Sequence, residues 1–264
     1  MISQEQVMNE LDELGLLEIV IKDSFETEEF DGTFKTLTIP MIKIPSLAAF
    51  NDQVDTYDSR RKKVISYNNA ILKTGQHDKG VKGEYSDAIY SSSKGYPVVK
   101  PVIIIQSAED QEYFLVEPKG EDLHQYLPDW ILSDIKGDEK ILAIFSALGK
   151  FFRVLEDNNA EYCHNAAGYS YGKKFEHMIG FRRKSDYEIL IIDNACFDDL
   201  ESNKFMSDLL NDINRFSSKF PEPISVFKKE FENGYGKNID EYLKIENQTS
   251  KSKAKRFLNL IFGD

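Results

Sequence analysis

A single long helix is the feature that most constrains how this amino-acid sequence can fold. Residues 138–158, DEKILAIFSALGKFFRVLEDN, place their large apolar side chains mostly three and four positions apart. This spacing brings the side chains onto one wide helical face, which is predicted to be buried. The predicted buried side chains are Ile141, Ile144, Phe145, Leu148, Phe151, Phe152 and Leu155.

Further helical patterns predict that the second half of the chain is predominantly helical. One β-hairpin is embedded among them, with arms at 175–183 and 187–193 and the turn KSD between the arms. The other predicted helices span 121–135, 202–219, 222–232, 238–244 and 250–262.

The first half of the chain is instead rich in strand-like segments. A helix is predicted at 3–14, and strands follow at 16–22, 33–39 and 41–44. The acidic segment 23–32 between the first two strands is predicted to be a turn.

The remainder of the first half mixes helical, loop and strand patterns. Residues 46–75 favour one or two helices, and the Gly- and Ser-rich stretch 75–95 is predicted to be a loop. Residues 98–107 and 112–118 flank AEDQ and indicate an antiparallel hairpin. The chain as a whole therefore predicts an α+β protein.

Composition and charge exclude several classes of protein. The chain has 264 residues, a formal net charge of −12 and 41% hydrophobic residues, which is sufficient for a folded core. An acidic chain is a poor sequence-independent ligand for nucleic acid, because phosphate neutralisation needs clustered Lys and Arg. No apolar run approaches the roughly 20 residues of a membrane-spanning helix, and the acidic, amphipathic N-terminus is no secretory signal. Two cysteines exclude a disulfide framework.

Residues 113–127, YFLVEPKGEDLHQYL, combine an apolar strand, a Gly-containing connector and the start of a helix. This stretch resembles the hinge of protein kinases, where a strand of the small lobe leads into the first helix of the large lobe. The resemblance implies that backbone groups near Glu117 and Lys119 hydrogen-bond the adenine edge of ATP. Gly120 would let the chain turn.

Residues 187–197, YEILIIDNACF, form an apolar strand that ends in Asp193 and a turn of small residues. This stretch is similar to the kinase strand that ends in D-F-G, so the resemblance implies that Asp193 binds Mg²⁺, a cation that prefers oxygen ligands. The segment FEHMIGF at 175–181 resembles the stretch that carries the metal-binding Asn of kinases. It places His177 at that position as a second candidate metal ligand.

Residues 147–167, ALGKFFRVLEDNNAEYCHNAA, resemble the helix that leads into the kinase catalytic loop. An ungapped match puts 162–164, Tyr-Cys-His, over H-R-D, and a shift of two residues puts 164–166, His-Asn-Ala, there. Neither version supplies the aspartate that accepts the proton of the substrate hydroxyl. His164 is the candidate catalytic base in its place, since an imidazole with an ordinary pKa of about 6.5 suits proton transfer near neutrality.

The segment MIKI at 41–44 supplies Lys43 as the candidate for the kinase lysine that contacts the α- and β-phosphates. Strand alternation places Met41 and Lys43 on one face, and it leaves open whether that face meets the nucleotide or the solvent. The helix expected at 57–73 contains no Glu to pair with this lysine, and Glu84 falls in the predicted loop. No G-x-G-x-x-G loop lies between the first two strands.

The resemblance implies a two-lobed protein-kinase-like fold of the α+β class. A small antiparallel β-lobe with one long helix is expected at 1–117, and a mostly helical, truncated C-lobe at 118–264. The implied function is binding of ATP and Mg²⁺, either by an atypical phosphotransferase or by a pseudokinase that acts through protein binding. The truncation is similar to that of kinases injected by bacterial pathogens, so the expected location is the cytoplasm or, for an effector, a host cell.

The acidic charge supports an alternative function of a different class. An acidic immunity or scaffold module would bind a basic protein partner without catalysis, through carboxylates such as those of residues 23–31. This alternative predicts salt-sensitive association and indifference to nucleotides. The basic segment 251–256 within the helix expected at 250–262 opposes the acidic average and is a candidate contact for a membrane surface or an acidic partner.

Overall fold

The chain forms two compact units in the computed structural model. The first unit comprises Met1–Gly120 and Ile192–Ala195, and the second comprises Glu121–Ile191 and Cys196–Asp264. The residues that the structure describes are 3–50, 55–59, 62–74, 78–123, 139–162, 178–183, 186–192, 197–199, 206–207, 209–210, 221–240 and 242.

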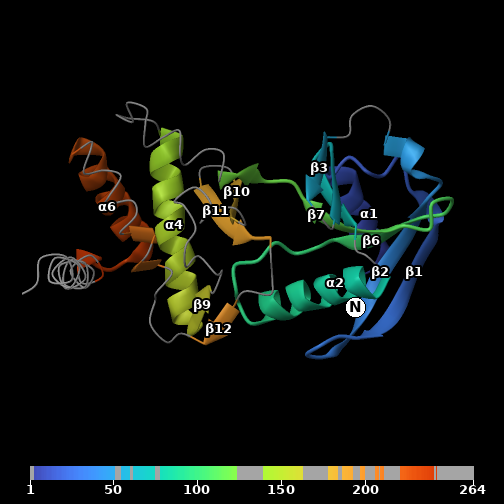
Figure 1. The fold of residues 1–264 in the computed structure, drawn as a ribbon, viewed down its shortest axis with the longest axis horizontal. Helices are drawn as coiled ribbons and strands as arrows, with labels where there is room; N and C mark the ends of the chain where they lie inside the picture. Colours follow the sequence, from blue (N-terminus) through green and yellow to red (C-terminus); the bar gives the residue numbers. More distant parts are fainter. Residues whose placement is uncertain are drawn as a thin grey trace, which may run out of the picture. The chain divides into compact units, whose positions relative to one another are not determined.

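A seven-stranded sheet forms the centre of the first unit (Figure 1). The strands lie in the order β1-β2-β6-β7-β5-β4-β3, and β2 and β6 are parallel whereas the other neighbours are antiparallel. The strands are β1 (Ile21–Asp31), β2 (Thr36–Ile44), β3 (Asp55–Ser59), β4 (Lys62–Tyr67), β5 (Ala70–Thr74), β6 (Ile103–Ser107) and β7 (Tyr113–Pro118).

Side chains alternate between the two faces of this sheet along every strand, so each face carries apolar side chains. Each face packs against one of the described helices. On one face lies α1 (Gln4–Glu13), whose Val7 and Leu11 join a core with side chains such as Ile42 and Leu72. On the other face lies α2 (Asp78–Ser93). Its Val81 and Tyr85 join a second core with Met41, Ile104 and Leu115.

The helix predicted at 3–14 is confirmed as α1. Ser3 precedes the helix and its hydroxyl accepts a hydrogen bond from the backbone N–H of Gln6, while the Gln6 side chain accepts one from the Ser3 backbone. This reciprocal pair satisfies two N–H groups that the first turn leaves without helical partners. The hairpin predicted at 98–118 is also confirmed, as β6 and β7.

The acidic segment 23–32 is a strand, so its prediction as a turn is wrong. Strand β1 begins at Ile21 and continues to Asp31, whereas most of 16–22 lies before it. The carboxylates are used within the sheet, since Glu29 accepts a hydrogen bond from Thr38 and Asp31 accepts one from Thr36. The segments predicted separately at 33–39 and 41–44 join into the single strand β2. A basic partner for this segment stays a prediction.

The predictions of helices at 46–75 and of a loop at 75–95 are both wrong. Residues 46–75 contain a short 3-10 helix, η1 (Leu47–Phe50), and then strands β3, β4 and β5. The β4–β5 connection contains Asn68, whose φ of 48° is a left-handed conformation that Asn tolerates in tight turns. Residues 78–93 within the predicted loop form helix α2, whose Val81, Tyr85 and Ala88 are buried at helical spacing.

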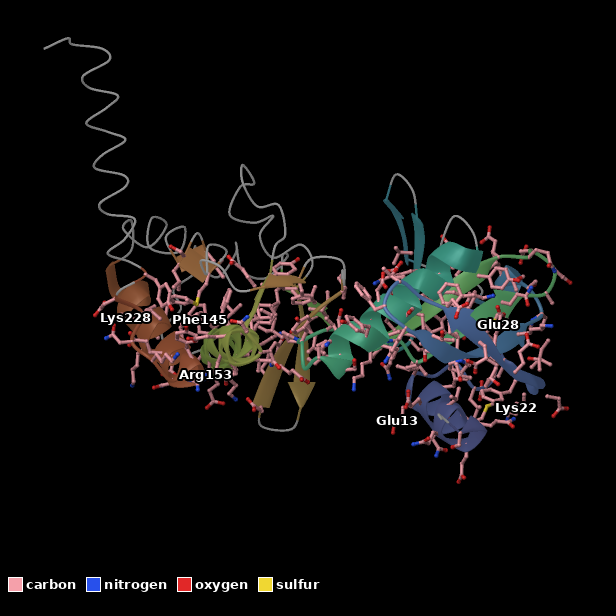
Figure 2. All side chains as sticks on the ribbon, turned by 90° about the horizontal axis from the view of Figure 1, so that it is seen from below. Glu13, Lys22, Glu28, Phe145, Arg153 and Lys228 are labelled. Carbon is pink, nitrogen blue, oxygen red and sulfur yellow. The ribbon has the colours of Figure 1, made fainter. Side chains whose placement is uncertain are left out.

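The second unit contains the long helix that the sequence predicts. Helix α4 (Glu139–Asp157) buries all seven side chains of the predicted apolar face. It packs against α6 (Pro221–Tyr235), which confirms the helix predicted at 222–232. Figure 2 labels Phe145 and Arg153 on α4 and Lys228 on α6, and the Phe145 ring meets Phe227 edge to face, with 4.7 Å between ring centroids.

Two glycines allow α4 and α6 to approach closely. A Cβ atom at Gly149 of α4 would collide with the backbone carbonyl oxygen of Phe231. A Cβ atom at Gly234 of α6 would collide in the same way with the carbonyl oxygen of Ser146. The backbones therefore meet at a distance that only glycine permits at these two positions.

Short strands complete the described part of the second unit. The hairpin predicted at 175–193 is confirmed as β10 (Met178–Arg183) and β11 (Asp186–Ile191), and β10 also pairs with β8 (Glu121–Asp122). Strand β9 (Ala160–Tyr162) pairs with β12 (Phe197–Asp199).

The other helices that the sequence predicts fall mostly outside the described residues. The helix at 250–262 lies entirely outside them, and those at 121–135 and 202–219 lie outside them except for a few positions. Four of the seven residues at 238–244 are described. Among the described residues, no helix is long and apolar enough to cross a membrane.

Candidate functional site

A buried lysine marks the candidate site of the first unit. Lys73 lies on β5, where alternation turns Leu72 toward the α1 face and Lys73 toward the α2 face of the sheet. Its side chain is only 10% exposed. A lysine this deeply buried needs oxygen partners to offset the loss of water around its ammonium group.

The closest partner of Lys73 is a glutamate on the neighbouring strand. Glu117 of β7 pairs with Ile71, and Leu115 pairs with Lys73, so Glu117 is the diagonal neighbour of Lys73 on the same face. The Lys73 Nζ atom lies 2.6 Å from Glu117 Oε2, and the Glu117 side chain is 2% exposed. The register of β5 and β7 thus builds a buried ion pair.

Two further groups complete the surroundings of this ammonium. The Lys73 Nζ atom lies 3.8 Å from Glu84 Oε1 of helix α2, and it donates a hydrogen bond of 3.2 Å to the backbone carbonyl of Ile192. Ile192 belongs to the first unit, although the chain reaches it from β11. We call Lys73, Glu84, Glu117 and the Ile192 carbonyl the Lys73 cluster.

The Lys73 cluster holds one cation among oxygen atoms at the edge of the buried interior. The Glu117 side chain is fully buried, whereas the Glu84 side chain is 21% exposed. The distance from Glu84 Oε1 to Lys73 Nζ is also longer than a hydrogen bond. A buried ammonium of this kind can neutralise phosphate oxygens when an anionic ligand replaces a loosely held partner. Chemically, the cluster suits anion binding with the helix residue Glu84 as the adjustable partner.

Lys43, the lysine favoured from the sequence, lies elsewhere in the same sheet. It is on β2, and three strand spacings separate β2 from β5, about 14 Å. The backbone N–H of Lys43 donates a 2.8 Å hydrogen bond to the Ser24 hydroxyl, and its side chain is half-buried. The structure does not bring Lys43 into the Lys73 cluster.

The connector residues Glu117 and Lys119 have more specific surroundings than the sequence predicts. Glu117 contributes its side chain to the Lys73 cluster, and its backbone lies in the β5–β7 ladder. The backbone N–H of Lys119 donates a 2.8 Å hydrogen bond to the carbonyl of Asn69. The adenine contact expected at this connector stays a prediction, and the Lys119 N–H already has a partner within the fold.

Asp193, His164 and His177 lie outside the described residues, so their roles stay predictions. Ile192, whose backbone carbonyl belongs to the Lys73 cluster, directly precedes Asp193 in the sequence. Among the side chains that the structure describes, no group of three or more His, Cys, Asp or Glu residues is arranged to hold a metal ion.

Sequence reasoning missed Lys73 and the helix that carries Glu84. The signal for Lys73 is the segment AILK at 70–73, which is similar to the V-A-I-K segment of kinases and ends in the same lysine. This segment does not stand out as a strand, because Val64, Tyr67 and Ile71 also fit the spacing of a helix. The signal for α2 is the buried stripe of Val81, Tyr85 and Ala88.

Comparisons with known proteins give a likeness in structure but no match among protein families or curated sequences. No protein-family model matches the chain. No curated protein matches it either. Among solved structures, the chain is similar to one described as WaaP in complex with acyl carrier protein, at 11% sequence identity and a TM-score of 0.45. The match covers 79% of this chain and 89% of that one.

Proposed function

We propose that this chain binds a nucleoside triphosphate at the Lys73 cluster and is a kinase-like protein of the phosphotransferase class. The observation that carries the proposal is the contact of a buried strand lysine with a helix glutamate, Lys73 with Glu84. Protein kinases use such a pair to hold the α- and β-phosphates of ATP. Lys73 therefore takes the phosphate-binding role that the sequence suggested for Lys43.

The remaining roles follow from the order of elements around this lysine. The strand with Lys73 is followed by helix α2 and then by the hairpin β6–β7, which leads into the connector 117–120. In the proposed two-lobed arrangement, the connector contacts adenine and Asp193, next to Ile192, holds Mg²⁺. His177 is a second proposed metal ligand, and His164 is the proposed base.

The proposal gives priority to nucleotide binding over catalytic power. Phosphoryl transfer depends mainly on positioning and on electrostatic stabilisation of the phosphoryl oxygens. Lys73 can supply part of that stabilisation, but neither alignment of the catalytic loop supplies the usual aspartate. Slow phosphotransfer and pure nucleotide sensing are both compatible with these residues, and a transfer assay with radiolabelled ATP separates them.

Glu117 is the main departure of this site from an ordinary kinase site. Its carboxylate lies 2.6 Å from the Lys73 ammonium, which is closer than Glu84 lies. A bound phosphate would compete with two carboxylates for one cation. We therefore expect ATP to bind weakly without Mg²⁺ and more tightly with it, because the metal offsets the added negative charge.

Isothermal titration with MgATP tests the proposal, provided that loss of binding is separated from loss of folding. Lys73→Met alone leaves Glu117 buried without its cation and should lower the free energy of unfolding by about 4 kcal/mol. The double variant Lys73→Met/Glu117→Leu removes both charges and should regain most of that stability. We expect the double variant to fold but not to bind MgATP.

Lys43→Met supplies the competing arm of this experiment. Lys43 and Lys73 are both strand lysines of one sheet, and only Lys73 joins the cluster. The proposal predicts that Lys43→Met binds MgATP as the wild type does. Loss of binding in Lys43→Met, with binding retained in the double variant, would assign the phosphate to Lys43 and overturn the proposal. A wild-type chain that binds no nucleotide would also end it.

A further inference from the structure

The hairpin β1–β2 grips helix α2 through a row of specific contacts. Its strands and turn reach α2 by an ion pair, a close backbone approach and an aromatic stack. We call these three contacts the hairpin clamp. The contacting pairs are Glu28 with Lys82, Gly32 with Ser86 and Phe34 with Tyr90.

The ion pair of the clamp joins the middle of β1 to α2. Both carboxylate oxygens of Glu28 lie 2.8 Å from the Lys82 Nζ atom. The Lys82 side chain is 7% exposed, whereas that of Glu28 is 48% exposed (Figure 2 labels Glu28). The lysine is therefore covered by the hairpin, and the glutamate reaches in from the surface.

The turn of the hairpin supplies the other two contacts. Phe34 is 58% exposed and stacks on Tyr90, with 4.2 Å between ring centroids and 11° between ring planes. A Cβ atom at Gly32 would collide with the Ser86 hydroxyl, so the turn lies directly on the helix.

The clamp and the Lys73 cluster use opposite flanks of α2. Each residue turns a helix by about 100°, so Val81, Tyr85 and Ala88 share the central stripe that faces the sheet. Lys82, Ser86 and Tyr90, spaced by four residues, form a row on one side of that stripe. Glu84 lies on the other side, toward Lys73.

This arrangement couples the two flanks mechanically. If α2 rolls about its axis, the clamp row and Glu84 move in opposite senses relative to the sheet. The 3.8 Å separation of Glu84 and Lys73 leaves room for such a motion in either direction, and Glu117 retains Lys73 meanwhile. The contacts of Glu28 and Phe34 therefore bear on how closely Glu84 approaches Lys73.

We propose that the hairpin β1–β2 is a built-in positioning element that sets the orientation of α2, and through it the engagement of Glu84 with Lys73. Glu28 and Phe34 are positioning residues, since they act through the helix and touch neither Lys73 nor its partners. This inference rests on the proposed function for its consequence, namely that the hairpin controls nucleotide affinity.

Two substitutions open the clamp, and two matched substitutions leave it closed. Phe34→Ala removes the aromatic stack and Glu28→Gln removes the ion pair, and both side chains are exposed enough for the fold to tolerate the change. Glu29→Gln is the charge control, because Glu29 faces the other side of the sheet and bonds Thr38. Ile21→Ala is the apolar control, because Ile21 is 40% exposed at the far end of β1.

The direct readout is the acetylation rate of Lys73, measured by competitive labelling and mass spectrometry. The half-exposed Lys150 of the second unit serves as the internal reference. We expect Phe34→Ala/Glu28→Gln to raise the relative labelling of Lys73 by about threefold to tenfold, the range expected for loss of one aromatic pair and one half-exposed ion pair. Both controls should match the wild type, and Phe34→Trp, which restores a stacked ring, should return labelling toward the wild-type rate.

The second readout is MgATP affinity, which we expect to fall by a similar factor in the clamp variants and to stay unchanged in the controls. Amide hydrogen exchange reports separately whether α2 has loosened. Faster exchange in α2 with unchanged Lys73 labelling would overturn the proposal, because the hairpin would then only cover the helix. Unchanged exchange and labelling together would overturn it as well.

The two proposals fail in distinguishable ways. If the wild-type chain binds no MgATP, the proposed function fails, and the labelling of Lys73 still decides whether the hairpin positions α2. If MgATP binds but the clamp variants change neither labelling nor affinity, the positioning role fails and the nucleotide site stands.

Discussion

Helices α2 and α4 are of similar length but are held in place by different forces. Helix α4 has 19 residues and buries a continuous apolar face against α6 and neighbouring strands. Helix α2 has 16 residues, and its buried positions include the polar side chains Lys82, Ser86 and Ser91. An apolar face packed along its whole length fixes a helix firmly. A helix with a narrow apolar stripe, held in addition by polar and aromatic contacts, can respond when one of those contacts changes.

The largest change in stability that distinguishes α4 from α2 is expected for a substitution where α4 crosses α6. Gly149→Ala puts a methyl group onto the carbonyl oxygen of Phe231, and neither backbone can move without disturbing the packed rings on both sides. We expect the free energy of unfolding of the second unit to fall by about 3 kcal/mol. Urea denaturation followed by far-UV circular dichroism measures it. A loss below about 1 kcal/mol would show that the helices can slide apart, and that α4 is as adjustable as α2.

Removing a buried hydroxyl group from α2 is expected to raise the free energy of unfolding. Among the described residues, Ser86 Oγ is fully buried and has no hydrogen-bond partner. Ser86→Ala removes this unsatisfied group and keeps the Cβ atom that faces Gly32, so we expect a gain of about 1 kcal/mol. Thermal unfolding compares the variant with Ser91→Ala on the same helix. A loss of stability would mean that the hydroxyl is bonded in solution.

A smaller gain is expected from the backbone of α2 itself. A Cβ atom at Gly83 would meet no atom within 4 Å, so Gly83→Ala adds helix propensity without a collision. The expected gain is about 0.8 kcal/mol, measured in the same unfolding experiment as Gly149→Ala. Gly149→Ala and Gly83→Ala together test whether close packing requires glycine in α4 but not at position 83 of α2. Destabilisation by Gly83→Ala would contradict that distinction.

The smallest effect concerns the pH dependence of the second unit. A hydrogen bond from Lys237, aided by one from Tyr235, holds the pKa of Glu156 below its usual range, although partial burial acts against it. Because the folded-state pKa lies below the unfolded one, the stabilisation is present above the ordinary range of glutamate and is lost as pH falls through the folded pKa.

Glu156→Gln checks this assignment. The variant should unfold at a lower temperature than the wild type at pH 7. The difference should shrink as the pH falls below about 4.3, the ordinary pKa of glutamate, and vanish below the lower pKa of the folded carboxylate. A difference that persists unchanged at acidic pH would assign the effect to packing around Tyr235. The control is Glu161→Gln, on the neighbouring strand β9.

The comparison of α2 and α4 also explains how much of the fold could be predicted from sequence. The apolar spacing of α4 exceeds any competing pattern, and all seven predicted side chains are buried. In α2, Gly80, Gly83 and the serines at 91–93 resemble loop residues, and the apolar stripe between them is only one residue wide. The helix forms because the sheet and the hairpin turn bury it, and these contacts are distant in sequence.

The candidate site was partly predictable for the same reason. The connector at Glu117 and the strand before Asp193 are local patterns, and the Ile192 carbonyl does reach the Lys73 cluster. The choice between Lys43 and Lys73 depends on which strand pairs with β7. Each lysine is the next-to-last residue of its strand and follows apolar residues, and only the sheet order places Lys73 diagonally from Glu117.

The parallel pairing of β2 with β6 has a consequence for how this protein can be dissected. The hairpin precedes β6 in sequence, yet it joins the sheet only once a strand about sixty residues later has formed, so docking is a slow, non-local step of folding. A chain shortened to remove the hairpin would expose the edge of β6, with its three consecutive isoleucines, to other copies of itself. Such a truncation would report on aggregation, and single substitutions in the full chain are the safer way to learn what the hairpin does.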